Sequence, residues 1–307
     1  MALIIEKKQI KDWISELEKK FIVFDTAKSV LPAKQYFFPP KEKTFVFNKK
    51  TNQLFVPKYK KKVLIICSQL EELEAITQLD EIMEKPQSDF YYSQRRKNSI
   101  LVGLIDKLIE TASGGDIILE KINEKQYRVL VLTDKGKEIL RSKFFKKVNK
   151  PKIKKYISEP NPFKNMLLDS EFLSKAVDWS KDHKIWDELA KKCLGCGICT
   201  YVCPLCHCFS IEDRVSLDNE KCSRCRQWDA CTLPGFSEIA GGHNFHKSIK
   251  ERYYNWFYHK FVRAYKEYGK AQCVACGNCK RNCPAGINIG DVIKEIVRDY
   301  KIHIKKY

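Results

Sequence analysis

Hydrophobic residues in the first half of the chain switch between helical and strand periodicity. In "IKDWISEL", Ile10, Trp13 and Leu17 recur every three or four residues, and charged residues occupy the other face. The run from Val63 to Cys67 is short, β-branched and bounded by lysines, which is typical of a buried strand. The following "LEELEAITQLDEIM" has helical spacing. This alternation predicts a mixed α/β arrangement.

Three further segments complete this first region. "DIILEKINEKQYRVLVLT" predicts a hairpin in which residues 116–119 pair with residues 127–132 across "EKINEKQ". "DKGKEILRSKFF" follows as a closing helix, and the proline-punctuated "LPAKQYFFPPKEKTFVFN" predicts short strands and turns. We assign residues 1–160 to one mixed α/β domain.

The second half of the chain has a mainly helical pattern. A basic, proline-containing stretch at residues 146–163 predicts a linker. Beyond it, "LSKAVDWSKDHKIWDELAKKC" and "KSIKERYYNWFYHKFVRAYKEYG" have helical spacing, with Tyr254, Phe257 and Phe261 recurring in the second segment. We assign residues 161–307 to a second, helical domain, so the predicted fold class is α+β.

The cysteine content adds chemistry to this outline. A chain of 307 residues is long enough to bury a sizeable core without disulfides, yet it contains 14 cysteines. One is Cys67, and the others lie between Cys193 and Cys283. "MALII" is too short for a secretory signal, and no stretch approaches the roughly 18–20 apolar residues of a membrane span. We expect a soluble, cytoplasmic protein whose clustered thiols serve metals or redox chemistry.

The formal net charge of +19 suggests an acidic partner. However, the lysines are scattered through segments such as "EKKQIKDWISELEKK" and "RSKFFKKVNKPKIKK", and no single motif gathers them with aromatic residues. We interpret them as a solvated surface. Attraction of an acidic protein is the first alternative, and nucleic acid is a less favoured partner.

Two copies of C-x2-C-x2-C-x3-C-P carry the strongest chemical signal. They are "CLGCGICTYVCP" at residues 193–204 and "CVACGNCKRNCP" at residues 273–284. Three thiols at every third residue can hold three corners of a cubane, and in two-cluster ferredoxins the fourth cysteine ligates the other cluster. We therefore predict two 4Fe-4S clusters with exchanged fourth ligands. The first set is Cys193, Cys196, Cys199 and Cys283, and the second set is Cys273, Cys276, Cys279 and Cys203.

Other features of the motifs agree with iron-sulfur binding. The glycines at positions 195, 197 and 277 let backbone amides approach cluster sulfurs. Structural zinc sites favour two separated cysteine pairs, so zinc is the less favoured metal. The long, largely helical sequence between Cys203 and Cys273 indicates a helical ferredoxin domain, because small ferredoxins have closely spaced repeats.

Five cysteines lie outside the two motifs, between residues 206 and 231. One of the C-x-C pair, together with the three cysteines that follow it, could hold a third iron-sulfur or zinc centre. The alternative is that these thiols are packed near the clusters, since free cysteine is commonly buried. His207 and His243 are candidate extra ligands, although a lone histidine is more often a hydrogen-bonded structural residue. The five are Cys206, Cys208, Cys222, Cys225 and Cys231.

Segments in and around the motifs carry a family resemblance. They are "HKIWDELAKKCLGCGICTYVCPLCHCFSIEDRVSLD", "RQWDACTLPGFSEIAGGHNF" and "CVACGNCKRNCPAGINI", with "LPAKQYFFPPKEKTFVF" and "DFYYSQRRKNSILVGL" upstream. The chain resembles the beta, electron-transfer subunit of cytosolic sulfhydrogenase-type NiFe hydrogenases and the related A subunit of anaerobic sulfite reductase. The resemblance implies a subunit that has no catalytic residues. It would connect an FAD- and NAD(P)-binding subunit to a hydrogenase or reductase subunit through iron-sulfur clusters.

The chain departs from that family in its first half. Members typically have a cysteine followed by aspartate after a strand, and further cysteines after the segment that matches "ILVGL". Here Ser68 follows Cys67, and "IDKLIETASGGDIILEK" contains no cysteine. We therefore expect no cluster in residues 1–160 and interpret Cys67 as a buried structural thiol. Cys222 and Cys225 look like additions, which favours a metal in the 206–231 group.

The sequence as a whole predicts electron transfer within a larger redox complex. It contains no G-x-G-x-x-G after a strand, "TASGGD" is too weak for a phosphate loop, and no nucleophile-and-base motif is present. Two alternatives remain open: a nucleic-acid-binding protein with structural clusters, and a free-standing ferredoxin-like carrier. A close pair of redox centres argues against the first, and the additional N-terminal domain argues against the second.

Overall fold

The chain forms two compact units, each described here on its own. The first contains Met1–Phe38 and Pro57–Pro160, and the second contains Pro39–Val56 and Asn161–Tyr307. The predicted division differs from this one, because it assigned residues 39–56 to the first domain. The computed structural model describes residues 2–106, 114–140, 143–149 and 161–306.

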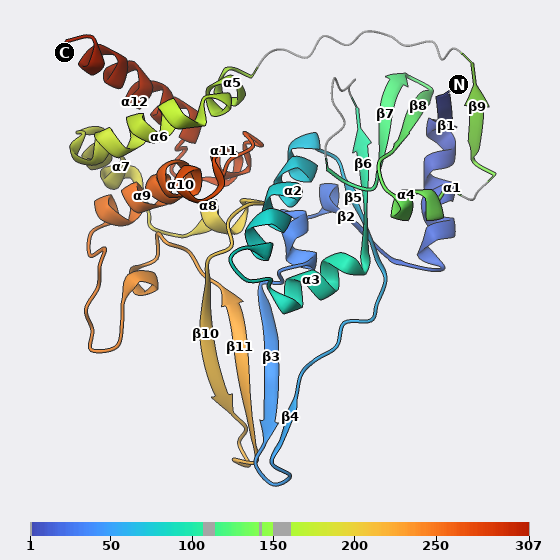
Figure 1. The fold of residues 1–307 in the computed structure, drawn as a ribbon, viewed down its shortest axis with the longest axis horizontal. Coiled ribbons are helices and arrows are strands. Elements are labelled where there is room, and N and C mark those ends of the chain that lie inside the picture. The colour runs from blue at the N-terminus through green and yellow to red at the C-terminus, as the bar shows by residue number, and fades with distance from the viewer. Residues whose placement is uncertain (1, 107–113, 141–142, 150–160, 307) are drawn as a thin grey trace. The chain divides into compact units, whose positions relative to one another are not determined.

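The first unit is built on a seven-stranded mixed sheet of order β2-β5-β6-β7-β8-β1-β9 (Figure 1). The pairs β2–β5, β5–β6 and β6–β7 are parallel, and the pairs from β7 to β9 are antiparallel. The strands are β1 (Ala2–Glu6), β2 (Ile22–Asp25), β5 (Val63–Cys67), β6 (Ser99–Ile105), β7 (Ile117–Asn123), β8 (Gln126–Val131) and β9 (Phe145–Val148).

Helices cover both faces of this sheet. Trp13 of α1 (Lys7–Glu18) packs in one core cluster with Leu64 and Ile66 of β5. Neighbouring strand residues point to the opposite face, where a Cβ added at Gly103 of β6 would meet Leu73 of α2 (Leu70–Glu84). Two shorter helices, α3 (Phe90–Lys97) and α4 (Asp134–Glu138), complete the unit.

Most element predictions for this unit are confirmed. The helix at "IKDWISEL", the strand at Val63–Cys67, the helix at "LEELEAITQLDEIM" and the hairpin are all present. The hairpin turn is tighter than predicted, because Asn123 pairs with Gln126 and most of "EKINEKQ" is strand. The predicted closing helix is wrong at residues 139–140 and 143–145, and residues 141–142 lie outside the described residues. Its last residue, Phe145, instead begins the edge strand β9, which pairs with β1, and the Phe145 ring lies edge-on against Trp13 at 5.4 Å.

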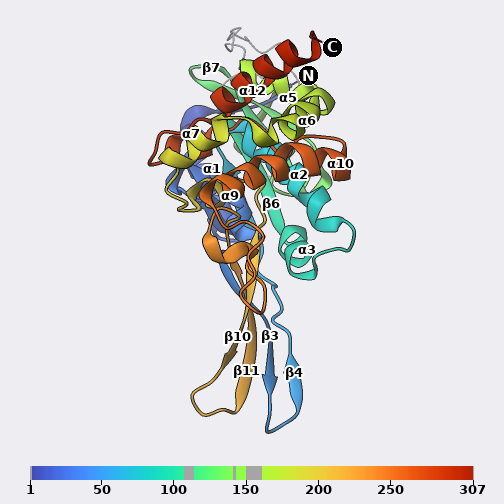
Figure 2. The same ribbon diagram turned by 90° about the vertical axis from the view of Figure 1, so that its left-hand side faces the viewer.

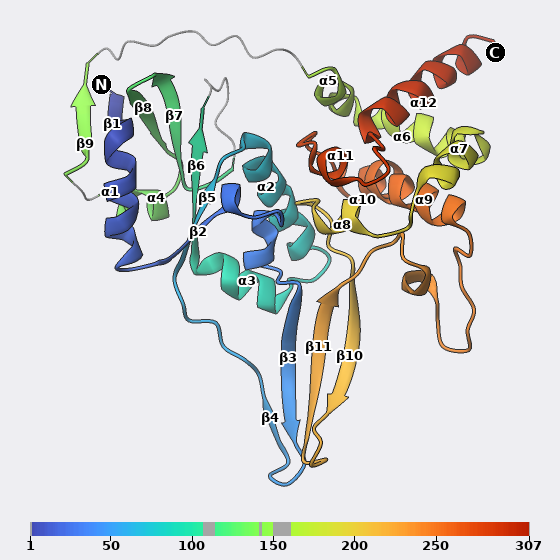
Figure 3. The ribbon, with the colours of Figure 1, turned by 180° about the vertical axis from the view of Figure 1, so that it is seen from behind.

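The second unit contains a helical bundle (Figure 3). Its core includes Trp186, Phe257, Phe261 and Ile293, none of which is exposed. The predicted linker at residues 146–163 lies mostly outside the described residues, and α5 begins inside it. The helices are α5 (Pro162–Leu168), α6 (Ser170–Trp179), α7 (Ile185–Lys192), α8 (Ile198–Tyr201), α9 (Ile249–Phe257), α10 (Ala264–Tyr268), α11 (Asn278–Asn282) and α12 (Ile289–Ile304), with a π-helical turn at Tyr258–Arg263.

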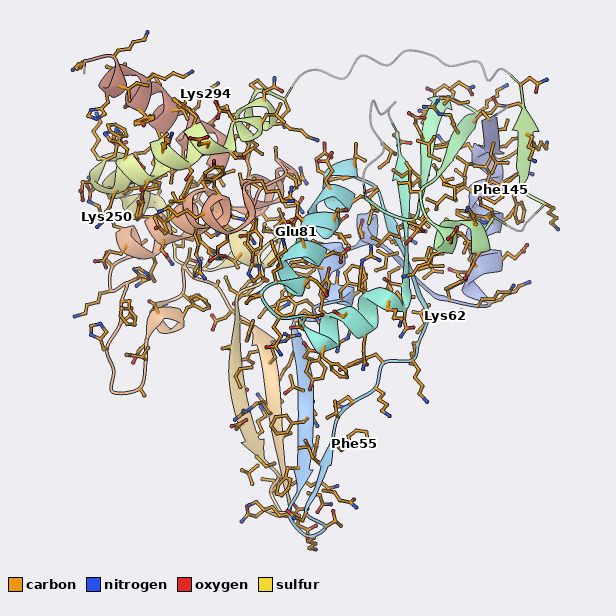
Figure 4. The ribbon with its side chains drawn as sticks, in the orientation of Figure 1. Phe55, Lys62, Glu81, Phe145, Lys250 and Lys294 are labelled. Carbon is orange, nitrogen blue, oxygen red and sulfur yellow. The ribbon has the colours of Figure 1, made fainter. Side chains whose placement is uncertain are left out.

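A four-stranded antiparallel sheet of order β10-β11-β3-β4 extends from these helices (Figure 2). The second unit therefore combines the predicted helices with a sheet that the sequence analysis did not predict. β3 joins this unit because it pairs with β11 along most of its length and buries an ion pair between Glu42 and Arg226. Phe55 lies toward the far end of the sheet (Figure 4). The strands are β3 (Lys41–Asn48), β4 (Gln53–Phe55), β10 (Phe209–Val215) and β11 (Lys221–Trp228).

No helix in the described part of the chain is both long enough and apolar enough to cross a membrane.

Candidate iron-sulfur sites

The two cysteine motifs fold into equivalent loops. In each, the third cysteine lies in a short helix, α8 or α11, whose N-cap is a glycine with φ of 76°. The residue before the second cysteine is also left-handed: Gly195 has φ of 62° and Ala275 has φ of 56°. These turns bring backbone amides toward the thiols, and the amide of Gly195 donates to Cys193 Sγ at 3.4 Å.

Two neighbouring cavities of the second unit gather the eight motif cysteines. Three thiols of the first motif line one cavity with Cys283 of the second motif, and three thiols of the second motif line the other cavity with Cys203 of the first. Each of the two predicted ligand sets lines one cavity, Cys279 lines both cavities, and the ligation itself stays a prediction. We call them the first site (Cys193, Cys196, Cys199 and Cys283) and the second site (Cys273, Cys276, Cys279 and Cys203).

Burial makes these thiols reluctant to ionise without a cation. Desolvation, with a smaller contribution from neighbouring sulfurs, raises the pKa of Cys199, Cys276 and Cys279 to about 12. Metal ligation requires thiolates, so a metal that binds here must displace protons. The sites therefore suit a strongly thiophilic group.

A buried lysine lies against the second site. Lys260 is 3% exposed, and its ammonium donates to Cys203 Sγ at 3.3 Å and to the Gln272 carbonyl at 3.4 Å. Burial alone would lower the pKa of this ammonium, but the sulfurs of Cys203 and its neighbours outweigh burial and raise it. Lys260 is therefore a fixed positive charge beside the thiols.

Two buried donors at the cavities support a sulfur-rich occupant. Within the described residues, Trp256 Nε1 and Thr232 Oγ1 are buried without a hydrogen-bond partner. Trp256 lines both cavities, and Thr232 lines the first. A buried donor without an acceptor is costly, and the sulfides of a cluster are acceptors. The residues present thus fit 4Fe-4S clusters.

The five remaining cysteines do not gather into one group. Cys206, Cys208 and Cys231 lie near the two sites, where a hydrogen bond with Cys203 raises the pKa of Cys206 and one with Cys208 raises the pKa of Cys231. By contrast, Cys222 opposes Val215 in the sheet.

Phe209, which directly follows Cys208, pairs with Trp228 of β11. Cys222 lies six positions before Trp228 on the same strand, which is about 20 Å along it. Among the described residues, no three His, Cys, Asp or Glu side chains are placed to hold a single metal ion, and this holds for the two sites as well as for residues 206–231. That residues 206–231 share a third centre stays a prediction, although the register of β10 and β11 separates Cys222 from Cys208. Cys222 and Cys225 both lie on β11, six and three positions before Trp228.

Neither candidate histidine lies among the thiols of a site. His207 is held by contacts of its Nδ1 with the Gln272 amide at 3.1 Å and the Leu205 carbonyl at 3.2 Å. His243 is exposed and packs edge-on against Phe245. Cys67 is fully buried at the end of β5, as predicted for a structural thiol.

Sequence reasoning missed Lys260, Trp256 and Ala275. Lys260 follows an aromatic helical stripe, but the π-helical turn that directs it inward leaves no clear pattern in the sequence. Ala275 occupies the motif position of Gly195, so comparing the two repeats would have found it.

Comparisons with known proteins agree with this site. Residues 192–287 match the family described as a 4Fe-4S dicluster domain. The chain is 29% identical over 289 residues to sulfhydrogenase 2 subunit beta of Pyrococcus furiosus, covering 89% of this chain and 84% of that protein. No solved structure matches the chain. The predicted resemblance is confirmed, and the chain contains a dicluster domain.

Proposed function

We propose that this chain is an iron-sulfur electron-transfer subunit of a cytoplasmic redox complex. It relays electrons between an FAD- and NAD(P)-binding subunit and a catalytic subunit of the hydrogenase, sulfur reductase or sulfite reductase type. Similarity to a sulfhydrogenase beta subunit supports this assignment, as does the dicluster domain. The chain itself provides electron transfer through its clusters, and its partner subunits provide the flavin and the substrate chemistry.

The observation that carries the proposal is the exchange of fourth cysteines between the motifs. Cys283 lines the cavity of the first motif, and Cys203 lines the cavity of the second. The thiolates of each site would hold one 4Fe-4S cluster, and a bound cluster supplies one-electron transfer. Trp256, Cys279 and Ile289 line both cavities, so a single layer of side chains separates the sites.

The surrounding residues give the two sites different access to partners. At the first site Cys196 is exposed, and Leu194 beside it is 68% exposed. At the second site the exposed Lys280 and Lys294 line the cavity (Figure 4 labels Lys294 on α12). An apolar contact at one site and basic side chains at the other would suit two different docking partners.

Anaerobic purification under mild conditions tests the proposal. We expect flavoprotein and catalytic subunits to copurify with the chain. NADH or NADPH should reduce the clusters within the complex but not in the isolated chain, which dithionite should reduce. An isolated chain that turns over substrate would contradict the proposal. So would a chain without reducible clusters that binds nucleic acid with a steep dependence on salt.

A further inference from the structure

Lys260 contacts both motifs at the second site. Its ammonium reaches Cys203 Sγ, which comes from the first motif, and the carbonyl of Gln272, which directly precedes the second motif. The same ammonium lies 5.3 Å from the centre of the Trp256 ring, in the layer that lines both cavities. One side chain therefore lies where the exchanged cysteine and the second loop meet.

The π-helical turn explains how a lysine comes to lie there. In Tyr258–Arg263 the main chain departs from the α-helical ladder, and the Lys260 carbonyl accepts the amide of Gln272 at 2.8 Å. Lys260 thus bonds both backbone polar groups of Gln272. This double contact fixes the ammonium in the buried site.

Within the described residues, no positive charge contacts a thiol of the first site, although the charge of the buried Arg252 acts on Cys193 through space. Among the residues that the structure describes, no lysine or arginine donates to one of its four thiols. The nearby buried Arg252 directs its guanidinium to the carbonyls of Thr232, His246 and Lys247 instead. The two sites share a motif but differ by one buried positive charge in direct contact with a ligand sulfur.

We infer that Lys260 makes the second site the more oxidising of the two, so that a single electron entering the chain resides there. Reduction adds negative charge to a buried centre, and a fixed ammonium nearby stabilises the reduced form through the low-dielectric interior. Lys260 is a positioning residue that acts through Cys203 and the field at the site. The inference rests on the proposed function, because it requires two clusters.

The test is an anaerobic redox titration of the iron-loaded chain, followed by EPR spectroscopy. Wild type should show two one-electron couples, and a Cys276→Ser variant should identify the couple of the second site. We expect Lys260→Met to lower the reduction potential of the second site relative to the first by about 59 mV or more. This corresponds to a loss of about tenfold in the preference of the electron for the second site. The charge-retaining Lys260→Arg should keep the wild-type order of potentials.

Lys266→Met is the matched control, because Lys266 lies on α10, is exposed and contacts the ring of Tyr258. It removes the same charge without touching a cysteine, and we expect no more than about a twofold change in preference. A Lys260→Met variant that holds both clusters and titrates as wild type would overturn the inference.

Iron content separates the remaining outcomes. If Lys260→Met loses the second cluster, Lys260→Gln should be titrated in its place with the same expected shift. If both neutral variants lose that cluster, Lys260→Arg decides: a retained cluster with the second site still the more oxidising supports the inference, and a reversed order of potentials overturns it. If all three variants lose the second cluster, the shape of the Lys260 side chain and not its charge holds the cluster, and the inference is wrong. Wild type without two reducible couples would instead refute the proposed function.

Discussion

The two thiol sites have the same ligand spacing but different surroundings. The first has an exposed thiol at Cys196, whereas the second has the buried Lys260 against Cys203 and the exposed Lys280 and Lys294 along its cavity. The motif fixes the loop, the left-handed turns and the thiol positions. Residues outside the motifs, such as Lys260, supply the charge beside the thiols and influence how far the thiols are exposed to solvent. Identical spacing therefore predicts identical ligands, while potential and access depend on the rest of the unit.

Even the loops differ at one position. Ala275 adopts the left-handed conformation that Gly195 adopts in the first motif. A left-handed residue with a Cβ costs about 1–2 kcal/mol, so the second loop is the more strained. Its added contacts, including the Gln272 amide to the Lys260 carbonyl and the Lys260 ammonium to the Gln272 carbonyl, offset this cost.

The largest expected effect breaks the exchange between the sites. Cys203→Ala should remove the cluster of the second site and spare that of the first, although Cys203 belongs to the first motif. Cys283→Ala should do the reverse. Iron analysis with EPR spectroscopy checks both, with about half of the iron lost in each variant. If Cys203→Ala lost only the first cluster, the exchanged ligation would be wrong.

A glycine pair compares the packing of the two loops. Gly197 and Gly277 have the same φ, but a Cβ at Gly197 would lie 2.8 Å from Ala230 Cβ, whereas one at Gly277 would lie 3.1 Å from the flexible tip of Arg281. We expect Gly197→Ala to destabilise the unit by about 3 kcal/mol and Gly277→Ala by about 1 kcal/mol. Anaerobic thermal denaturation at one scan rate measures this difference, and equal losses would contradict it.

Gln272 tests the support that is specific to the second site. Its side-chain amide donates to the Leu205 carbonyl at 2.8 Å, in the segment that follows Cys203. Gln272→Leu removes this donor and leaves His207 Nδ1 as the remaining polar contact of the carbonyl, so it should cost about 1 kcal/mol. Iron should then leave the second site faster under a mild chelator. Gln53→Leu, at an exposed glutamine of β4, is the control and should change neither quantity.

Exchanging the left-handed residues should have a smaller effect of opposite sign at the two sites. Ala275→Gly relieves a strained turn and should stabilise the second loop by about 0.5 kcal/mol, since glycine also loosens the unfolded chain. Gly195→Ala should destabilise the first loop by a similar amount, because a Cβ strains the left-handed backbone there. The loss stays small because the Cβ would have ordinary clearance from Thr232. Thermal midpoints of the two variants and of the double variant check this. Shifts of the same sign would show that the loops are not equivalent.

The smallest expected effect concerns the cysteines on β11. Replacing Cys222 and Cys225 together by alanine should leave iron, sulfide and zinc per chain unchanged, because the sheet holds both residues away from the two sites. Metal analysis by mass spectrometry measures this. A loss of about one metal ion per chain would restore the third centre.

The gathering of the motif cysteines at two cavities could be predicted from sequence, because cysteine spacing constrains cluster geometry directly. The hairpin and α1 followed from periodicity because their partners are local or strongly amphipathic. The pairing of β3 with β11 did not, since it joins segments far apart in the chain and depends on contacts such as that of Glu42 with Arg226. Lys260 was missed for a related reason: a charged residue in an amphipathic helix predicts a solvated face, and only the π-helical turn reverses that expectation.

The most direct test of the central claim is the content of iron, zinc and acid-labile sulfide in anaerobically purified chain. Two clusters predict about eight iron atoms and eight sulfides per chain, with little zinc. Stoichiometric zinc with little iron would contradict the account, because the two sites would then be structural and could not relay electrons.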